Sequence, residues 1–194
     1  MMNGLYYVIE RENNDNHSVF EWDQASGKYG LGAAVNDPTQ LKLKLGTPIP
    51  SSPEWVDFHE LPEPVLSTRL GELLLAMEIY GIELVPAIVR DPREKLESKN
   101  YVYMHVWNQI GCVNEQESEL NRYKNGKIFE FEKLILNEET LAEVDENKRL
   151  IFTLKEQSSV ILIHQLIKNK IEELGTTGIR FYPVNEWYSD IAFD

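Results

Sequence analysis

A helix followed by a glycine and a short strand occurs twice in this chain, and this duplication constrains the fold more than any other feature. The first copy spans residues 66–86, LSTRLGELLLAMEIYGIELVP, and the second spans residues 163–183, IHQLIKNKIEELGTTGIRFYP. Gly178 corresponds to Gly81 at an offset of 97 residues (178 − 81), and the same offset aligns the rest of the two copies. The chain is therefore expected to contain two structurally related elements.

Apolar residues in each copy recur in steps of four, four and three, which places them on one face of a helix. Ser67 precedes the first set at the position of an N-cap, and its counterpart is His164. A glycine ends each helix, and an alternating strand follows it. Gly71 lies inside the first helix at a cost of about 1 kcal/mol relative to alanine, which close packing against a strand would explain. The apolar positions are Leu66, Leu70, Leu74 and Met77 in the first copy and Ile163, Ile167, Ile171 and Leu174 in the second.

Alternating or β-branched segments in the rest of the chain predict short strands. With 194 residues the chain fits a single domain. We expect an α+β fold with two main helices in a duplicated strand–helix–strand element, and each copy is expected to add a strand to a shared, mostly antiparallel or mixed sheet. The remaining strand segments are residues 5–9, 19–22, 41–45, 101–107, 109–113, 128–136 and 150–154.

The duplication also divides the single domain, 1–194, into consecutive segments. The tail carries Trp187 and is expected to dock on the body of the domain. The segments are the N-terminal strands and loops (1–64), the first repeat (65–87), the inter-repeat strands and acidic segment (88–157), the second repeat (158–184) and the C-terminal tail (185–194).

Charge and composition narrow the classes of function. The chain has 32 acidic and 19 basic residues, a net charge of −13, which argues against direct binding to nucleic acid. Such a charge either serves solubility alone or complements a basic protein partner. It contains no apolar run of about 18 residues, so no transmembrane helix is expected. The N-terminus lacks the pattern of a signal peptide, which predicts a cytoplasmic protein. Cys112 is the single cysteine and leaves no internal disulfide or cysteine-rich zinc site.

No motif of a known catalytic or cofactor site is present. The phosphate-binding patterns GxxxxGK[ST] and GxGxxG are absent, as are GxSxG and HExxH. Cys112 lies in a strand-like run, where a small buried side chain is expected. We therefore expect no catalytic residue, no metal and no cofactor. The four histidines, none at ligand spacing from another, are His17, His59, His105 and His164.

Acidic residues are concentrated in residues 130–146, which hold seven carboxylates and one base, Lys133. Such a segment forms either a solvated loop face or a surface that docks a basic protein. Residues 115–119 carry a second, weaker acidic cluster with the same two interpretations. The candidate partner-binding residues are Glu138, Glu139, Glu143, Asp145 and Glu146.

Several segments taken together resemble the bacterial immunity-protein family of polymorphic toxin systems. The resemblance covers residues 6–184 and is strongest over residues 65–184. The segments that carry it are VLSTRL (65–70), GIELVPAIV (81–89), YVYMHVWNQIGCVN (101–114), FEKLILNEETL (131–141), LIFTL (150–154), SSVILI (158–163) and TGIRFYPV (177–184).

The resemblance implies a protein without enzymatic activity that binds a cognate protein toxin and neutralises it by steric and electrostatic occlusion. It also implies that the repeats are the framework and that the partner surface lies between them, in residues 90–149. Two alternatives stay open. One is an enzyme with a dispersed carboxylate–histidine site around His59 or His105, and the other is a structural protein that self-associates through exposed strand edges.

Overall fold

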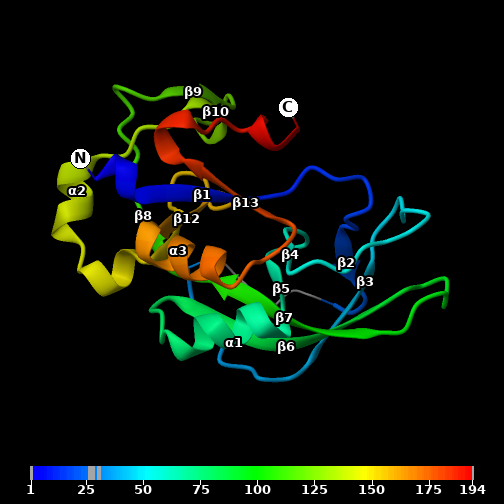
Figure 1. The fold of residues 1–194 in the computed structure, drawn as a ribbon. Coiled ribbons are helices and arrows are strands. Elements are labelled where there is room, and N and C mark those ends of the chain that lie inside the picture. The colour runs from blue at the N-terminus through cyan, green and yellow to red at the C-terminus, as the bar shows by residue number, and fades with distance from the viewer. Residues whose placement is uncertain (1, 26–28, 30–31, 194) are drawn as a thin grey trace.

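A computed structural model describes residues 2–25, 29 and 32–193. Within these residues the chain forms three α-helices and 13 strands (Figure 1). The elements are β1 (Tyr6–Arg11), β2 (Phe20–Trp22), β3 (Leu41–Leu45), β4 (Phe58–His59), β5 (Val65–Ser67), α1 (Thr68–Ala76), β6 (Ile82–Arg90), β7 (Lys99–Val106), β8 (Gln109–Ile110), β9 (Glu119–Arg122), β10 (Ile128–Lys133), α2 (Glu138–Glu143), β11 (Ile151–Leu154), β12 (Ile161–His164), α3 (Gln165–Glu173) and β13 (Ile179–Pro183).

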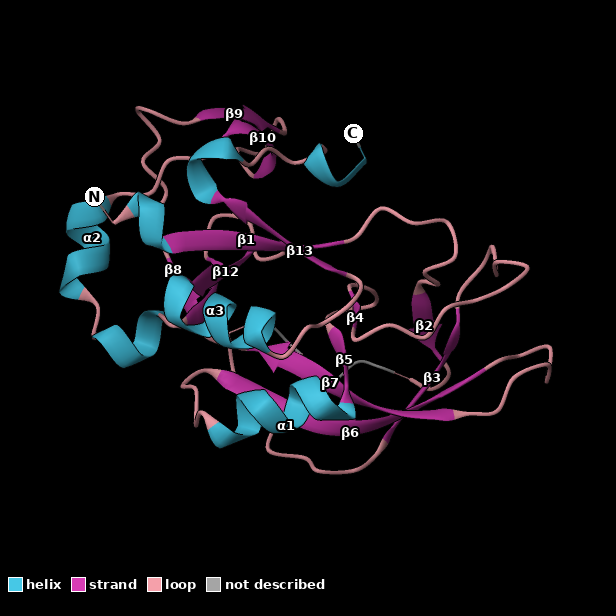
Figure 2. Cartoon of the chain, in the orientation of Figure 1, coloured by secondary structure: helices cyan, strands magenta, loops and turns pink. Residues whose placement is uncertain are grey.

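The strands form two larger sheets and one hairpin (Figure 2). One sheet has the order β2-β3-β6-β7-β5-β4, and the other has the order β13-β1-β12-β11-β8. Most neighbours are antiparallel, whereas β3–β6 and β8–β11 are parallel. The hairpin pairs β9 with β10. These elements confirm the α+β class with antiparallel and mixed sheets.

Both copies of the repeat fold as a strand, a helix and a strand, as the spacing predicts. The elements are β5–α1–β6 and β12–α3–β13. Ser67 caps α1 through its Oγ, which accepts a hydrogen bond from the main-chain N–H of Leu70 at 3.4 Å. His164 caps α3 in the same way, because its Nδ1 accepts a hydrogen bond from the N–H of Leu166 at 3.2 Å. Imidazole nitrogen thus replaces the hydroxyl as cap in the second copy.

The expectation of one shared sheet is wrong, because each copy belongs to a different sheet. In the first copy β7 lies between β5 and β6 and is antiparallel to both, so that Tyr103 pairs with Val65 on one side and Val85 on the other. In the second copy β1 takes this place between β12 and β13. The middle strand of the first copy, β7, thus follows the repeat in the chain, whereas the middle strand of the second copy, β1, precedes it.

The apolar faces of the two helices share one core between the sheets. Leu70 and Leu74 of α1 pack in the same cluster as Ile167 and Ile171 of α3, together with Met104 of β7. Figure 1 shows α3 beside β1, β12 and β13 in the upper part of the view and α1 beside β5, β6 and β7 in the lower part. The helices therefore join the two halves through buried apolar surface, the main source of stability in such folds.

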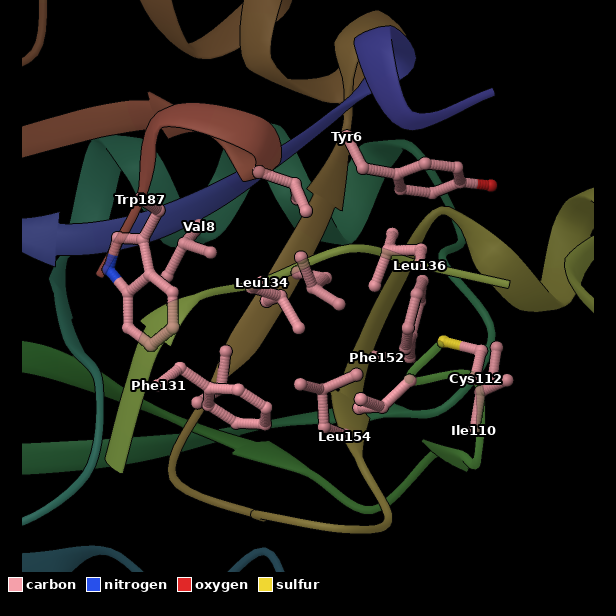
Figure 3. Packing of buried hydrophobic residues seen from close by; sticks show 14 of the residues in the cluster. Tyr6, Val8, Ile110, Cys112, Phe131, Leu134, Leu136, Phe152, Leu154 and Trp187 are labelled. Atoms are coloured by element: carbon pink, nitrogen blue, oxygen red, sulfur yellow. The ribbon is translucent and has the colours of Figure 1, made fainter. Parts of the chain in front are cut away.

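Two further apolar clusters cover the outer faces of the sheets. The hairpin and the C-terminal tail close one cluster against the five-stranded sheet, where the rings of Phe131 and Trp187 lie 6.2 Å apart. Figure 3 shows these rings at one end of the cluster and Cys112 at the other. The tail docks through Trp187, as predicted. The third cluster packs Phe20 and the three leucines of β3 against the six-stranded sheet.

The inter-repeat segment differs in detail from its predicted strands. Residues 101–113 contain two strands that belong to different sheets, because the chain leaves the six-stranded sheet after β7 and enters the other at β8. Residues 119–133 form the β9–β10 hairpin, with a turn at Gly126. Gly71 packs against Val102 of β7, where an added Cβ would lie 2.8 Å from a methyl carbon, and this explains its place inside α1.

Candidate functional site

A cavity of about 390 Å³ lies where the connector before β5, strand β1 and the C-terminal tail meet. Four carboxylates line it: Glu10 on β1, Glu60 and Glu63 in the connector, and Asp190 in the tail. No lysine, arginine or histidine is present among the described residues that line it. We name this feature the carboxylate cavity. Its apolar wall includes Ile9, Phe58, Val106, Ile161 and Trp187.

Burial controls the protonation of these carboxylates. Burial raises the pKa of Glu10 to about 7, and the nearby charge of Glu60 adds to this effect. The indole Nε1–H of Trp187 donates a hydrogen bond to Glu10 Oε1 at 2.8 Å and opposes part of the rise. Burial also raises the pKa of Glu60 and of Glu63. The cavity therefore holds one carboxyl group, that of Glu10, with a pKa of about 7, beside two others whose pKa values burial raises.

This arrangement suits two kinds of chemistry. A carboxyl group with a pKa near 7 beside a second carboxylate is the pattern used in general acid–base catalysis. The same desolvated carboxylates also favour a cationic group, which would compensate their charge. Leu61 and Phe129 border the cavity with 47% and 40% of their surface exposed.

The histidines lie outside this cavity. His59 stacks on Phe20 with 3.9 Å between ring centroids, its Nδ1 lies 2.7 Å from the carbonyl oxygen of Ser18, and burial lowers its pKa to about 4. His105 is fully buried on β7, with its Nε2 at 3.0 Å from the carbonyl oxygen of Ala33. Neither histidine lines the carboxylate cavity. Both are held by aromatic neighbours and main-chain oxygens, as packed core side chains are.

Metal and thiol chemistry find little support in the described residues. No group of three or more histidine, cysteine, aspartate or glutamate side chains there could hold a metal ion. Cys112 is buried, and burial raises the pKa of its thiol well above the ordinary range. A thiol in this state is a poor nucleophile. The helices of the described chain reach nine residues in α1 and α3, too few to cross a bilayer.

The predicted acidic segment forms α2 and the turn after it. Glu138 anchors the N-terminal segment, because its Oε1 accepts a hydrogen bond from the main-chain N–H of Asn3 at 2.9 Å. Asp145 and Glu146 pair within the turn with Lys148 and Arg149, respectively. Glu139 and Glu143 are exposed on α2. Three of the five candidate residues thus have partners in the chain itself.

The two acidic clusters found in the sequence meet in space. An open hollow of about 750 Å³ is lined by Glu138 and Glu139 from one cluster and by Glu115 and Glu117 from the other. No basic side chain is present among the described residues that line this hollow. We name it the acidic hollow. Its negative potential is expected to attract basic protein surfaces.

An ion pair between the buried carboxylate of Asp57 and the half-exposed guanidinium of Arg69 ties the connector to both copies of the repeat. Asp57 accepts hydrogen bonds from Arg69 Nε at 2.7 Å, from Ser67 Oγ at 2.6 Å and from the N–H of Thr177 at 2.8 Å. Burial alone would raise the pKa of Asp57, but these hydrogen bonds outweigh it and hold the pKa well below its ordinary range. Arg69 also donates to the carbonyl oxygen of Leu174 at the end of α3. This site is structural, because its groups satisfy one another.

Sequence reasoning missed the carboxylate cavity and the Asp57 ion pair. Glu10 and Glu60 are 50 positions apart in the chain, and an acidic chain offers many such pairs without distinction. Trp187, whose indole reaches Glu10, was placed only as a docking residue. The one available signal was the position of Glu10 at the end of an otherwise apolar strand, flanked by Ile9.

Comparison with protein families gives one match. Residues 50–186 match the model of an immunity protein family, Imm11. This range contains both repeats and most of the residues that line the acidic hollow and the carboxylate cavity. The match begins later than the resemblance seen from residue 6. Comparison with curated proteins gives no match. Because the family model covers well over half of the 194 residues, the chain belongs to the Imm11 immunity protein family.

Proposed function

We propose that this protein is an immunity protein that binds a cognate toxin in the cytoplasm and neutralises it by occlusion, without catalysis. The observation that carries the proposal is the family match over residues 50–186. The net charge of −13 supports a partner with a basic surface. A specific interface of this kind buries about 1,600 Å² in total, so it would extend well beyond any single hollow.

We propose that the acidic hollow and the exposed face of α2 form part of this interface. Glu139 and Glu143 are exposed there, and Glu115 and Glu117 extend the negative surface across the hollow. Charges at the edge of an interface act mainly on the association rate. The interface is therefore expected to form fast at low salt and more slowly as salt screens the two proteins.

Co-expression with the product of the neighbouring gene, tested as the candidate toxin, tests the proposal. We expect survival of the producing cells and co-purification of the two proteins. The double variant Glu139→Lys/Glu143→Lys is expected to associate about tenfold more slowly at low salt. The matched control is Glu97→Lys/Glu173→Lys, which changes the charge equally on other exposed surface. Cells that die despite a well-expressed wild-type protein would contradict an immunity function.

A second candidate, an enzyme, is favoured by one observation, the carboxylate cavity with the pKa of Glu10 near 7. Separate measurements of cell survival and of toxin binding distinguish an enzymatic mechanism from occlusion. If the protein acts by chemistry, Glu10→Gln/Glu60→Gln should bind the toxin and fail to protect the cells. If the protein acts by occlusion, this variant should bind the toxin and protect the cells to the same extent as the wild type. The third candidate, self-association through strand edges, requires that light scattering show oligomers at micromolar concentration.

A further inference from the structure

The internal repeat allows one half of the protein to be compared with the other, position by position. The registers of the sheets give the correspondence. Val102 of β7 pairs with Leu66 and Pro86, and Tyr7 of β1 pairs with the residues 97 positions further along, Ile163 and Pro183. Val102 and Tyr7 therefore occupy the same place in the two halves.

The second copy is filled at this place by a lysine. The Nζ of Lys168 on α3 lies 4.9 Å from the ring centroid of Tyr7 and 5.7 Å from that of Phe181. The same Nζ lies 2.6 Å from Glu172 Oε1, and the side chain is only 16% exposed. Lys168 thus covers the sheet with its aliphatic stem, while its charge is matched by two aromatic faces and a carboxylate.

The first copy has smaller residues at each of the three corresponding positions. Gly71 replaces Lys168, Val102 replaces Tyr7, and Leu84 replaces Phe181 at the offset of 97. A groove of about 350 Å³ lies here between α1 and strands β6 and β7. At Gly71 the helix lies close to β7, because an added Cβ would lie 2.8 Å from Val102 Cγ2, so no side chain of α1 can reach into the groove from this position.

The surface of this groove is mainly apolar, with one acid and the neutral polar residues Gln40, Thr68 and Asn100 at its border. Leu75 lines it with 67% of its surface exposed and stands where the second copy has Glu172. Glu72, one turn of helix before Ala76, also lines it. No lysine or arginine is present among the described lining residues. An apolar floor with one carboxylate and no base is complementary to a long basic side chain, whose stem is apolar and whose end is charged.

We propose that the groove beside Gly71 receives a lysine or arginine side chain of the partner toxin, in the place that Lys168 fills in the second copy. This inference rests on the proposed function, because it assigns the toxin a basic anchor residue. The stem of that residue lies on Val102 and Leu84, and its cation reaches the carboxylate of Glu72. The anchor would be buried and well packed, as residues that dominate interface energies are.

A small probe tests the groove without the toxin. Nα-acetyl-lysine N-methylamide is titrated into labelled protein while NMR follows the amide of Gly71 and the methyl groups of Leu75 and Val102. We expect saturable shifts at these groups, weaker binding of the norleucine analogue, and loss of the lysine preference in Glu72→Gln. Shifts spread over the whole acidic surface, or equal binding of norleucine, would overturn the proposal, and the latter would assign the groove to an apolar side chain.

Paired leucine variants test the same groove with the toxin. Leu75 and Leu166 are exposed on α1 and α3 at 67% and 62%, so a serine at either position leaves the core intact. We expect Leu75→Ser to weaken toxin binding about tenfold, the loss expected for an anchor contact, and Leu166→Ser to change it less than about twofold. Equal effects would refute the groove. A toxin that fails to bind the wild-type protein refutes the proposed function instead, and the probe titration then decides the groove.

Discussion

Removing the charge of Glu10 should stabilise the protein at alkaline pH. The carboxyl group of Glu10 is half-buried beside Glu60, and burial raises its pKa from 4.5 to about 7. Between these values the folded protein keeps a proton that the unfolded chain releases, so stability falls as pH rises through this range. The full rise corresponds to at most about 3.5 kcal/mol at about 1.4 kcal/mol for each pH unit. Screening by solvent around a half-buried group reduces this to roughly 1–2 kcal/mol.

The variant Glu10→Gln keeps an oxygen that can accept the hydrogen bond from Trp187 and has no charge to bury. We therefore expect the free energy of unfolding of this variant, relative to that of the wild type, to increase by about 1 kcal/mol between pH 5.5 and pH 8.5. For a domain of this size that change widens the difference in melting temperature by about 3 °C. Thermal unfolding followed by circular dichroism at both pH values measures it.

A control and a clear negative result complete this experiment. The variant Glu143→Gln removes one carboxylate from the exposed face of α2 and reports the effect of net charge alone. If Glu10→Gln is destabilised by the same amount at pH 5.5 and pH 8.5, the carboxylate does not carry a burial cost. The account of the carboxylate cavity as a desolvated site would then be wrong.

Three further changes test the framework. Asp57→Asn removes the charged acceptor of the hydrogen bonds from Arg69, Ser67 and Thr177 and should lower the free energy of unfolding by about 2 kcal/mol, measured in urea; a loss below about 0.5 kcal/mol would contradict its role. Gly71→Ala should lower stability by about 1 kcal/mol, because overpacking against Val102 outweighs the gain in helix propensity, and adding Val102→Ala should restore part of the loss. Cys112 should resist a thiol reagent in the native protein and react fully in denaturant, whereas rapid native reaction would contradict its burial.

The local parts of the fold could be predicted because their causes are local. Ser67 stands directly before the periodic apolar positions of α1 and caps that helix. The helices end at Ala76 and Glu173, earlier than the predicted stops, and the positive φ angles next to their ends belong to Glu78 and Gly175. Gly81 and Gly178, at φ 84° and 78°, instead lie directly before β6 and β13. Helix caps, glycine stops and apolar periodicity act over a few residues, so one sequence contains the whole signal.

The arrangement of the sheets could not be predicted from the same signals. The strand between β12 and β13 is β1, from the opposite end of the chain. The residues of β1 contain no local signal that predicts pairing with these two strands. Strand pairing depends on contacts between distant segments and on the burial that the whole domain achieves. The carboxylate cavity has the same origin, since Glu10 and Glu60 meet only after these strands have paired.

The two copies of the repeat also change where function is to be sought. Duplication suggests a framework, and the segment between the copies then looks like the place for a partner. A duplicated framework, however, is informative where its copies differ, because the shared backbone fixes what each side chain faces. Lys168 covers Tyr7 in one copy, while Gly71 lies against Val102 in the other and leaves a groove. Gly71, where α1 packs most tightly against β7, therefore also borders the groove that we propose for a side chain of the partner.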